Sequence, residues 1–158
     1  MTAANQAPIK ELSSAEELAV VFKFLTPDEV HELTDYLEYR EYSPGTVVIK
    51  EGELGEYMGF LAGGKLEIKK ETNFPGKFVI VAILDRGTMV GEMAVVEKLP
   101  RSATVMVKEE AKLLILTTEK MEQLIAEKPQ LGIKILKRIL HILSLRLRSL
   151  DDRLSWLL

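Results

Sequence analysis

Six short runs of strand-forming residues lie between residues 43 and 117, separated in most cases by turn signals such as Ser-Pro-Gly and Asp-Arg-Gly. Many short strands with frequent turns are typical of a β-sandwich or β-barrel. The Gly-Gly pair at residues 63 and 64 predicts a tight hairpin, because such turns need positive φ. The wholly apolar run at 78–84 predicts a buried strand. The expected strands are 46–49, 57–61, 66–70, 78–84, 103–107 and 112–116.

Helical signals precede these strands. Residues 15–25 predict a short helix with Ser13 or Ser14 as its cap. A second helix is expected to start after Thr26 and to end near Tyr39. Thr26 suits an N-cap position because its hydroxyl can accept a hydrogen bond from a free amide of the first turn.

Helical signals also follow the strands. Thr117 or Thr118 is expected to cap a helix over residues 119–127, and Pro129 opens a long helix toward the C-terminus. A chain of 158 residues suits one domain, since domains average roughly 150 residues. We expect a mainly β domain with flanking helices. Its parts are a flexible leader at 1–14 and a domain at 15–158, with a jelly-roll-like β-barrel at about 45–117 and C-terminal helices at 118–158.

Charge and composition exclude several classes of protein. The net charge is −3, and residues 129–158 carry six Lys or Arg and two Asp, which gives +4 there and −7 in the rest. This balance predicts no nucleic-acid partner. No apolar run approaches the roughly 20 residues that span a bilayer, so no membrane partner is expected. The chain has no Cys, so an oxidising compartment is neither needed nor excluded. Residues 1–14 lack a signal-peptide stretch, so we expect a cytoplasmic location.

The segment at residues 87–105 interrupts the strands and carries the chemistry. Gly91 permits the close approach of a ligand, and the residues after it can form one helical turn whose first amides favour an anion. Arg101 follows nine residues after Glu92, and a guanidinium binds phosphate oxygens in a bidentate manner. A carboxylate such as Glu92 accepts hydrogen bonds from a hydroxyl pair, as in ribose recognition. Together they indicate a nucleotide.

This segment resembles a known family. Gly-Glu-Met-Ala at 91–94, followed by Pro-Arg-Ser-Ala-Thr at 100–104, is similar to the phosphate-binding cassette of cyclic-nucleotide-binding domains. Residues 48–53 and 61–64 fit the same pattern, and the resemblance covers about residues 46–148. One departure is Val90, where the family often has Phe. The resemblance implies the cyclic-nucleotide-binding fold, a regulatory role, and cAMP or cGMP as the ligand. No Ser lies in a recognisable catalytic context, so we expect no enzymatic activity.

The resemblance also implies roles for individual residues. Glu92 would bind the ribose 2′-hydroxyl, Arg101 would pair with the cyclic phosphate, and the Ser102 hydroxyl could add a hydrogen bond. The family links Thr after the cassette Arg with a preference for cGMP, so Ser102 favours cAMP weakly. The backbone amides expected to line the phosphate and sugar belong to Gly91, Met93, Ala94, Ser102 and Ala103.

Other readings of the same residues remain open. Glu92 and Arg101 could form a simple surface ion pair. The chain could also have kept the fold and lost its ligand, which would make it a structural dimer or scaffold. A transcription regulator would need a DNA reader that we do not find in the sequence. His31 and His141 lie too far apart to indicate a metal site, and no cofactor is expected.

The C-terminal helix carries two apolar rows. One has the 3-4 spacing of a coiled-coil seam, and the other lies off this seam at Ile135, Ile139 and Ile142. We expect one row to pack on the chain's own barrel and the Leu row to form a homodimer, in which Arg146 faces Asp151 of the other chain. Alternatively, both rows pack within one chain. The seam residues are Ile133, Leu136, Leu140, Leu143, Leu147, Leu150, Leu154 and Leu157.

These observations predict a stand-alone, homodimeric sensor of cyclic nucleotides. Ligand binding would change the contacts that favour one position of the C-terminal helix over another. The helix would then signal to an unidentified partner protein.

Overall fold

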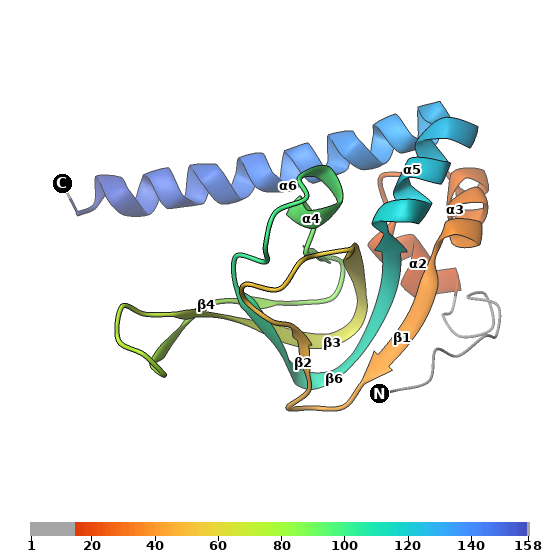
Figure 1. Ribbon diagram of the computed structural model, residues 1–158. Coiled ribbons are helices and arrows are strands. Elements are labelled where there is room, and N and C mark those ends of the chain that lie inside the picture. The colour runs from red at the N-terminus through yellow and green to blue at the C-terminus, as the bar shows by residue number, and fades with distance from the viewer. Residues whose placement is uncertain (1–14, 158) are drawn as a thin grey trace.

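The computed structural model, which describes residues 15–157, contains one antiparallel sheet flanked by helices and crossed by one long helix (Figure 1). The sheet order is β1-β6-β3-β4, with β2 paired to β6 and β5 paired to β3. The path does not close on itself, so the strands form a jelly-roll-like rolled sheet rather than a closed barrel. This confirms the expected fold class. The strands are β1 Glu38–Tyr42, β2 Val47–Ile49, β3 Tyr57–Glu71, β4 Phe78–Leu84, β5 Met89–Val90 and β6 Thr104–Thr117.

The expected leader at residues 1–14, and the expected cap at Ser13 or Ser14, lie outside the described residues. The division into this leader and a single domain stays a prediction.

Two predicted interruptions between strands are wrong, because the structure has one continuous strand at each place. The Gly63-Gly64 segment lies inside β3, whose register with β6 shifts on either side of these glycines. Gly64 has φ +82°, and a Cβ there would lie 2.0 Å from the Glu110 carbonyl oxygen. The positive φ therefore serves bulges that bend one long strand rather than a turn between two. Likewise, the runs at 103–107 and 112–116 are parts of the single strand β6.

The N-terminal helices are shorter than expected. α2 spans Ala15–Val21, and α3 spans Pro27–Leu33 with the expected Thr26 cap, completed by a capping box with Glu29. A short 3-10 turn, η1 Thr34–Tyr36, follows, and the chain then enters β1. The helix expected to end near Tyr39 was wrong because Tyr39 is a buried residue of β1, paired with Leu114 of β6.

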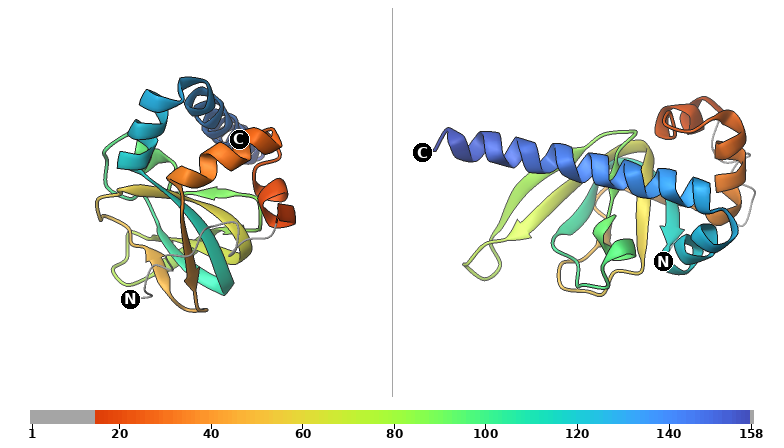
Figure 2. Two further views of the ribbon diagram at one scale, coloured as in Figure 1. Left: turned by 90° about the vertical axis from the view of Figure 1, so that its right-hand side faces the viewer. Right: turned by 90° about the horizontal axis from the view of Figure 1, so that it is seen from above.

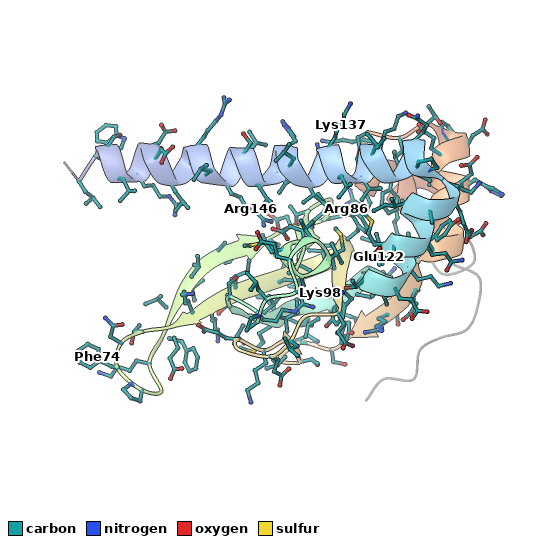
Figure 3. All side chains as sticks on the ribbon, turned by 45° about the horizontal axis from the view of Figure 1, so that its top comes forward. Phe74, Arg86, Lys98, Glu122, Lys137 and Arg146 are labelled. Carbon is teal, nitrogen blue, oxygen red and sulfur yellow. The ribbon has the colours of Figure 1, made fainter. Side chains whose placement is uncertain are left out.

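The apolar strand β4 is exposed rather than buried. Only its last residue, Leu84, is buried, and β4 pairs with β3 alone. The β3–β4 hairpin extends away from the rest of the fold, with Phe74 near its tip (Figures 1 and 3). An apolar run predicts a strand, but it does not say which faces other elements cover.

Three helices complete the fold: α4 Met93–Val96, α5 Thr118–Glu127 and α6 Pro129–Ser155. Thr117 caps α5 by accepting a hydrogen bond from the Lys120 amide. Among the described helices, none combines the length and apolar character needed to cross a membrane.

The core has two parts. One lies inside the rolled sheet around Leu113 and Ile115, and the other lies between the sheet and the helices. α6 contributes Leu131, Ile135 and Ile139 to the second part, which places one of its two predicted rows on the chain's own body. α6 begins at the end of the sheet where α2, α3 and α5 lie, and it runs away from these helices along the sheet (Figure 2).

Candidate ligand-binding site

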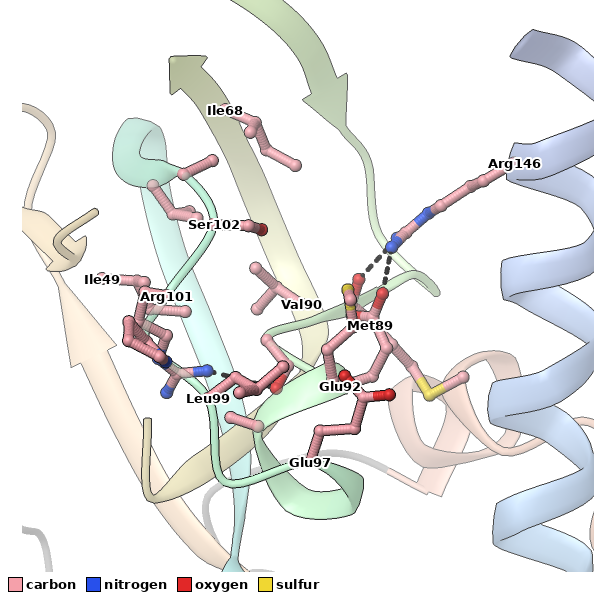
Figure 4. Close-up of a pocket in the computed structure, with 16 residues that line it drawn as sticks. Ile49, Ile68, Met89, Val90, Glu92, Glu97, Leu99, Arg101, Ser102 and Arg146 are labelled. Atoms are coloured by element: carbon pink, nitrogen blue, oxygen red, sulfur yellow. Dashed lines mark hydrogen bonds and ion pairs between the residues drawn. The ribbon is translucent and has the colours of Figure 1, made fainter. Parts of the chain in front are cut away.

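A cavity of about 240 Å³ lies between the rolled sheet and α6. The structure brings all seven residues nominated from the sequence to its lining, together with Arg146 of α6 (Figure 4). The remaining wall includes apolar side chains such as Ile49, Ile68 and Val105. The cavity thus combines an apolar surface with a few converging charged groups, as small-molecule sites do. The seven nominated residues are Gly91, Glu92, Met93, Ala94, Arg101, Ser102 and Ala103.

Gly91 brings the two halves of the cassette together. It follows β5 with φ +69°, a conformation that favours glycine. Its carbonyl oxygen accepts a hydrogen bond of 3.1 Å from Nη1 of Arg101. A Cβ at this position would lie 2.5 Å from the same nitrogen, so only glycine leaves room for the guanidinium.

Arg101 is a buried cation with no carboxylate partner. Its Nη2 donates to the Tyr57 carbonyl oxygen at 2.7 Å, and its guanidinium lies 4.9 Å from the centre of the Tyr57 ring. Among residues 15–157, no carboxylate forms an ion pair with it, although it is only 8% exposed. Burial lowers the pKa of Arg101 from its ordinary value, because desolvation penalises the charged form. Glu92 acts on Arg101 through space and partly offsets this effect, but it forms no ion pair with it. A buried charge without a directly paired opposite charge is costly, so this arrangement favours an anion in the cavity.

Two residues that sequence reasoning missed hold Arg101 in place. A Cβ on Gly55 would lie 2.7 Å from Nε of Arg101 and 2.4 Å from the Cβ of Ala94. Tyr57 is fixed in turn by its hydroxyl, which donates to the Val48 carbonyl oxygen at 2.8 Å. Nothing in the local sequence marks these two residues, because both act through a segment more than forty positions away.

Glu92 is also buried, and its carboxylate is occupied. Its side chain is 4% exposed and accepts a hydrogen bond from Nη1 of Arg146. Nη2 of Arg146 donates to the Met89 carbonyl oxygen at 3.0 Å. Arg101 and Arg146 approach the cavity from opposite sides, with Glu92 nearer to Arg146 (Figure 4). The carboxylate that a ribose would need is therefore tied to the long helix.

Arg146 corrects one sequence-based expectation. We placed it on the seam, facing Asp151 of a second chain, but it points into the cavity of its own chain. A signal for this was present, because Arg146 extends the row Ile135, Ile139, Ile142 by the same 4-3-4 spacing. That row faces the chain's own core.

Two backbone groups of the cassette already have hydrogen-bond partners within the chain. The Ala94 amide donates to the Gly91 carbonyl oxygen at 3.2 Å, which closes the turn before α4. The Ser102 carbonyl oxygen accepts from Nζ of Lys70 at 2.8 Å, while the Ser102 side chain is exposed at the cavity wall. Of the described residues, no three His, Asp or Glu side chains are placed to hold a metal ion.

Comparison with known proteins agrees with this geometry. The sequence model of the family described as "Cyclic nucleotide-binding domain" matches residues 39–128, which is more than half of the chain. The chain belongs to this family. Its rolled sheet is therefore the fold of this family.

Particular relatives fall in different classes of protein. The chain is 30% identical over 137 residues to the cyclic AMP receptor protein of Thermus thermophilus, covering 87% of this chain and 61% of that protein. It is 38% identical over 85 residues to the cAMP-dependent protein kinase regulatory subunit of Mycosarcoma maydis, covering 54% of this chain and 16% of the subunit. The chain thus spans less than two thirds of either relative.

A solved structure gives the same picture. The crystal structure of a cyclic nucleotide-binding domain from Methylobacillus flagellatus superimposes with a TM-score of 0.81 at 28% identity, covering 87% of this chain and 80% of that one.

Proposed function

We propose that this chain is a regulatory module, not an enzyme, that binds a cyclic nucleotide, either cAMP or cGMP. The observation that carries the proposal is Arg101, a buried guanidinium without a carboxylate partner in the described chain, on a cavity that also contains a buried carboxylate. This pair matches the two polar parts of a cyclic nucleotide, its phosphate and its ribose hydroxyl. The cytoplasmic location expected from the sequence belongs to the same proposal.

Each polar group has one role in this proposal. Arg101 pairs with the cyclic phosphate, and the backbone amides of Gly91, Met93, Ser102 and Ala103 line that phosphate and the sugar. The Ala94 amide joins them only if its hydrogen bond to Gly91 lengthens. Glu92 accepts the ribose 2′-hydroxyl, and the Ser102 hydroxyl adds a hydrogen bond. The apolar wall, which includes Ile68 and Val105, takes the base and sugar faces.

The bond between Arg146 and Glu92 connects the ligand to α6. A ribose hydroxyl that bonds to Glu92 competes with Arg146 for the same carboxylate. The ligand-free arrangement therefore includes a contact between the cavity and α6 that the ligand weakens. A ligand shifts a conformational equilibrium only through such differences in contacts. We propose that α6 moves in response and signals to a partner protein.

The exposed row of α6 supports assembly as a homodimer. Seven of its eight seam residues are exposed on the single chain, whereas Ile135 and Ile139 of the other row are buried. Leu143 packs partly against the core and marks where the two rows meet. The exposed seam residues with the largest free surfaces are Leu140, Leu147, Leu154 and Leu157.

A second candidate is a structural dimer or scaffold that has kept the fold without the ligand. The observation that favours it is again the Arg146–Glu92 bond, because a permanent bond would close the ribose site. Isothermal titration calorimetry with cAMP, cGMP and linear 5′-AMP separates the two candidates. The sensor binds at least one cyclic nucleotide more tightly than 5′-AMP. If neither cyclic nucleotide gives a heat of binding or raises the melting temperature, the scaffold is the candidate that remains.

A further inference from the structure

An apolar groove of about 250 Å³ runs between α4 and α6, next to the ligand cavity, with which it shares Met93 and Glu97. Its walls are Met93 and Val96 of α4, and Leu136, Leu140 and Leu143 of α6. Val96 is 57% exposed and Leu140 is 68% exposed, so neither is covered by the chain's own elements. Beyond the groove, the exposed row of α6 continues through Leu147, Leu150 and Leu154. Such a long apolar surface marks an interaction site.

We propose that this groove receives α6 of a second copy of the chain, so that the partner helix contacts α4 as well as α6. This proposal deepens the proposed homodimer, and it rests on that part of the proposed function. It adds that the helix directly following Glu92 is itself part of the interface. The dimer seam and the nucleotide cassette then share one short segment.

The length of the surface favours this occupant. The exposed row extends from Ile133 to Leu154, which is about 32 Å at 1.5 Å per residue. An occupant must present an apolar row over the same length. Among the described helices, α6 with 27 residues is long enough, and the next longest has 10. A two-fold dimer also needs a self-complementary surface, and a row of Leu at seam spacing is one.

Charge favours the same occupant. The segment 129–158 carries +4, and the remainder of the chain carries −7. Glu97 places an exposed carboxylate on the groove wall. Where the second α6 passes α4, its basic residues can therefore meet Glu97, which improves the complementarity of the two surfaces on that side of the groove.

The position of α4 gives the interface a regulatory consequence. Glu92 is the N-cap residue of α4, whose four residues end at Val96. A ligand that changes the position of Glu92 acts on the same short helix that the partner copy contacts. Nucleotide binding and dimerisation are then linked, and each changes the equilibrium constant of the other by the same factor.

Sedimentation equilibrium without nucleotide tests the interface directly. Val96→Asp should raise the dimer dissociation constant about tenfold or more, because it buries a charge in an apolar contact. The matched control is Val81→Asp, which changes a valine of similar exposure on β4 (49% against 57%) and should leave the dimer dissociation constant within about threefold of the wild-type value. Leu140→Asp should also dissociate the dimer, and its control on the same helix, Leu145→Asp, should not. Circular dichroism checks that every variant is folded.

Each other outcome overturns the proposal. A Val96→Asp variant that dimerises like Val81→Asp removes α4 from the interface, whereas a disruptive Val81→Asp moves the interface to β4. A wild-type chain that stays monomeric up to high concentration rejects the dimer altogether. Because nucleotide is absent, these results do not depend on whether the chain binds cyclic nucleotides. A chain that fails the calorimetric test could still pass this one.

A spectroscopic variant gives a second measurement. The chain has no Cys, so Val96→Cys takes a single environment-sensitive fluorophore. Its emission should shift on dilution with the same midpoint as dissociation. An emission that does not depend on protein concentration, in a sample that dissociates, shows that α4 lies outside the interface.

Discussion

Arg146 of α6 donates a hydrogen bond to the carboxylate of Glu92, fifty-four positions earlier in the chain, at the N-cap of α4. The two residues come from elements with few other contacts between them, and the bond lies on the wall of the ligand cavity. In Figure 3, Arg146 projects from the side of α6 that faces the sheet, whereas Lys137 projects from the opposite side. The long helix therefore contributes a charge to the site without taking part in the cassette.

The first prediction concerns this bond. Arg146→Ala should raise the affinity for a cyclic nucleotide several-fold, because the competitor for Glu92 is removed. It should also lower the melting temperature of the ligand-free chain, because a buried carboxylate loses its partner. Calorimetry and thermal unfolding measure the two effects.

Arg148→Ala is the matched control for Arg146→Ala, since it removes a second arginine from the same helix without touching the cavity. It should leave affinity unchanged. A loss of affinity in Arg146→Ala would mean that Arg146 binds the nucleotide itself.

The second prediction concerns the phosphate. Arg101→Lys should weaken binding by about 2–5 kcal/mol, because an ammonium cannot reproduce the planar fork that bonds a phosphate. The control is Arg40→Lys, which changes a cation 5.3 Å from the centre of the Tyr57 ring and outside the cavity lining. This variant should bind the nucleotide with wild-type affinity. Calorimetry on both variants decides, and equal affinity in Arg101→Lys and wild type would contradict the assigned role.

The third prediction concerns the space around the guanidinium. Gly55→Ala should lower nucleotide affinity about tenfold or more, because the new methyl group would lie within 3 Å of Arg101 and displace it. Gly63→Ala is the control, since a Cβ there meets Lys112 only at an ordinary 3.4 Å. Affinity and melting temperature should be measured for both. If the two variants bind the nucleotide equally well, the close packing of Gly55 against Arg101 does not contribute to nucleotide affinity.

The site was more predictable from sequence than the fold details around it. All seven nominated residues line one cavity because the cassette is local: Gly91 to Ala103 is thirteen positions, and its residue types identify its chemistry. Gly55, Tyr57 and Arg146 were missed or misplaced because their contacts depend on tertiary packing. A glycine pattern alone could not distinguish a hairpin from a bulge at Gly64. The apolar run of β4 could not show that, within the described chain, this strand pairs with β3 alone and keeps most of its side chains exposed.

The α6 rows show where periodicity is informative and where it stops. The spacing separated the buried Ile135 and Ile139 from the exposed Leu140 and Leu147, as the structure has them. It could not decide whether anything covers the exposed row, because the periodicity of one chain does not identify its partners.

The last prediction concerns the sugar, and it uses the ligand as the probe. Glu92→Gln removes the negative charge but keeps the shape of the side chain. It should weaken binding of the ribonucleotide more than binding of the 2′-deoxy analogue, because only the former offers a hydroxyl to the carboxylate. Glu97→Gln is the control, since Glu97 lines the same cavity but is exposed. Combining Glu92→Gln with Arg146→Ala extends the test: if Arg146 acts only by competing for Glu92, the gain in affinity from Arg146→Ala should shrink or vanish in the Glu92→Gln background. Equal losses for the ribo and deoxy ligands would place Glu92 away from the sugar, and an undiminished gain would separate Arg146 from Glu92.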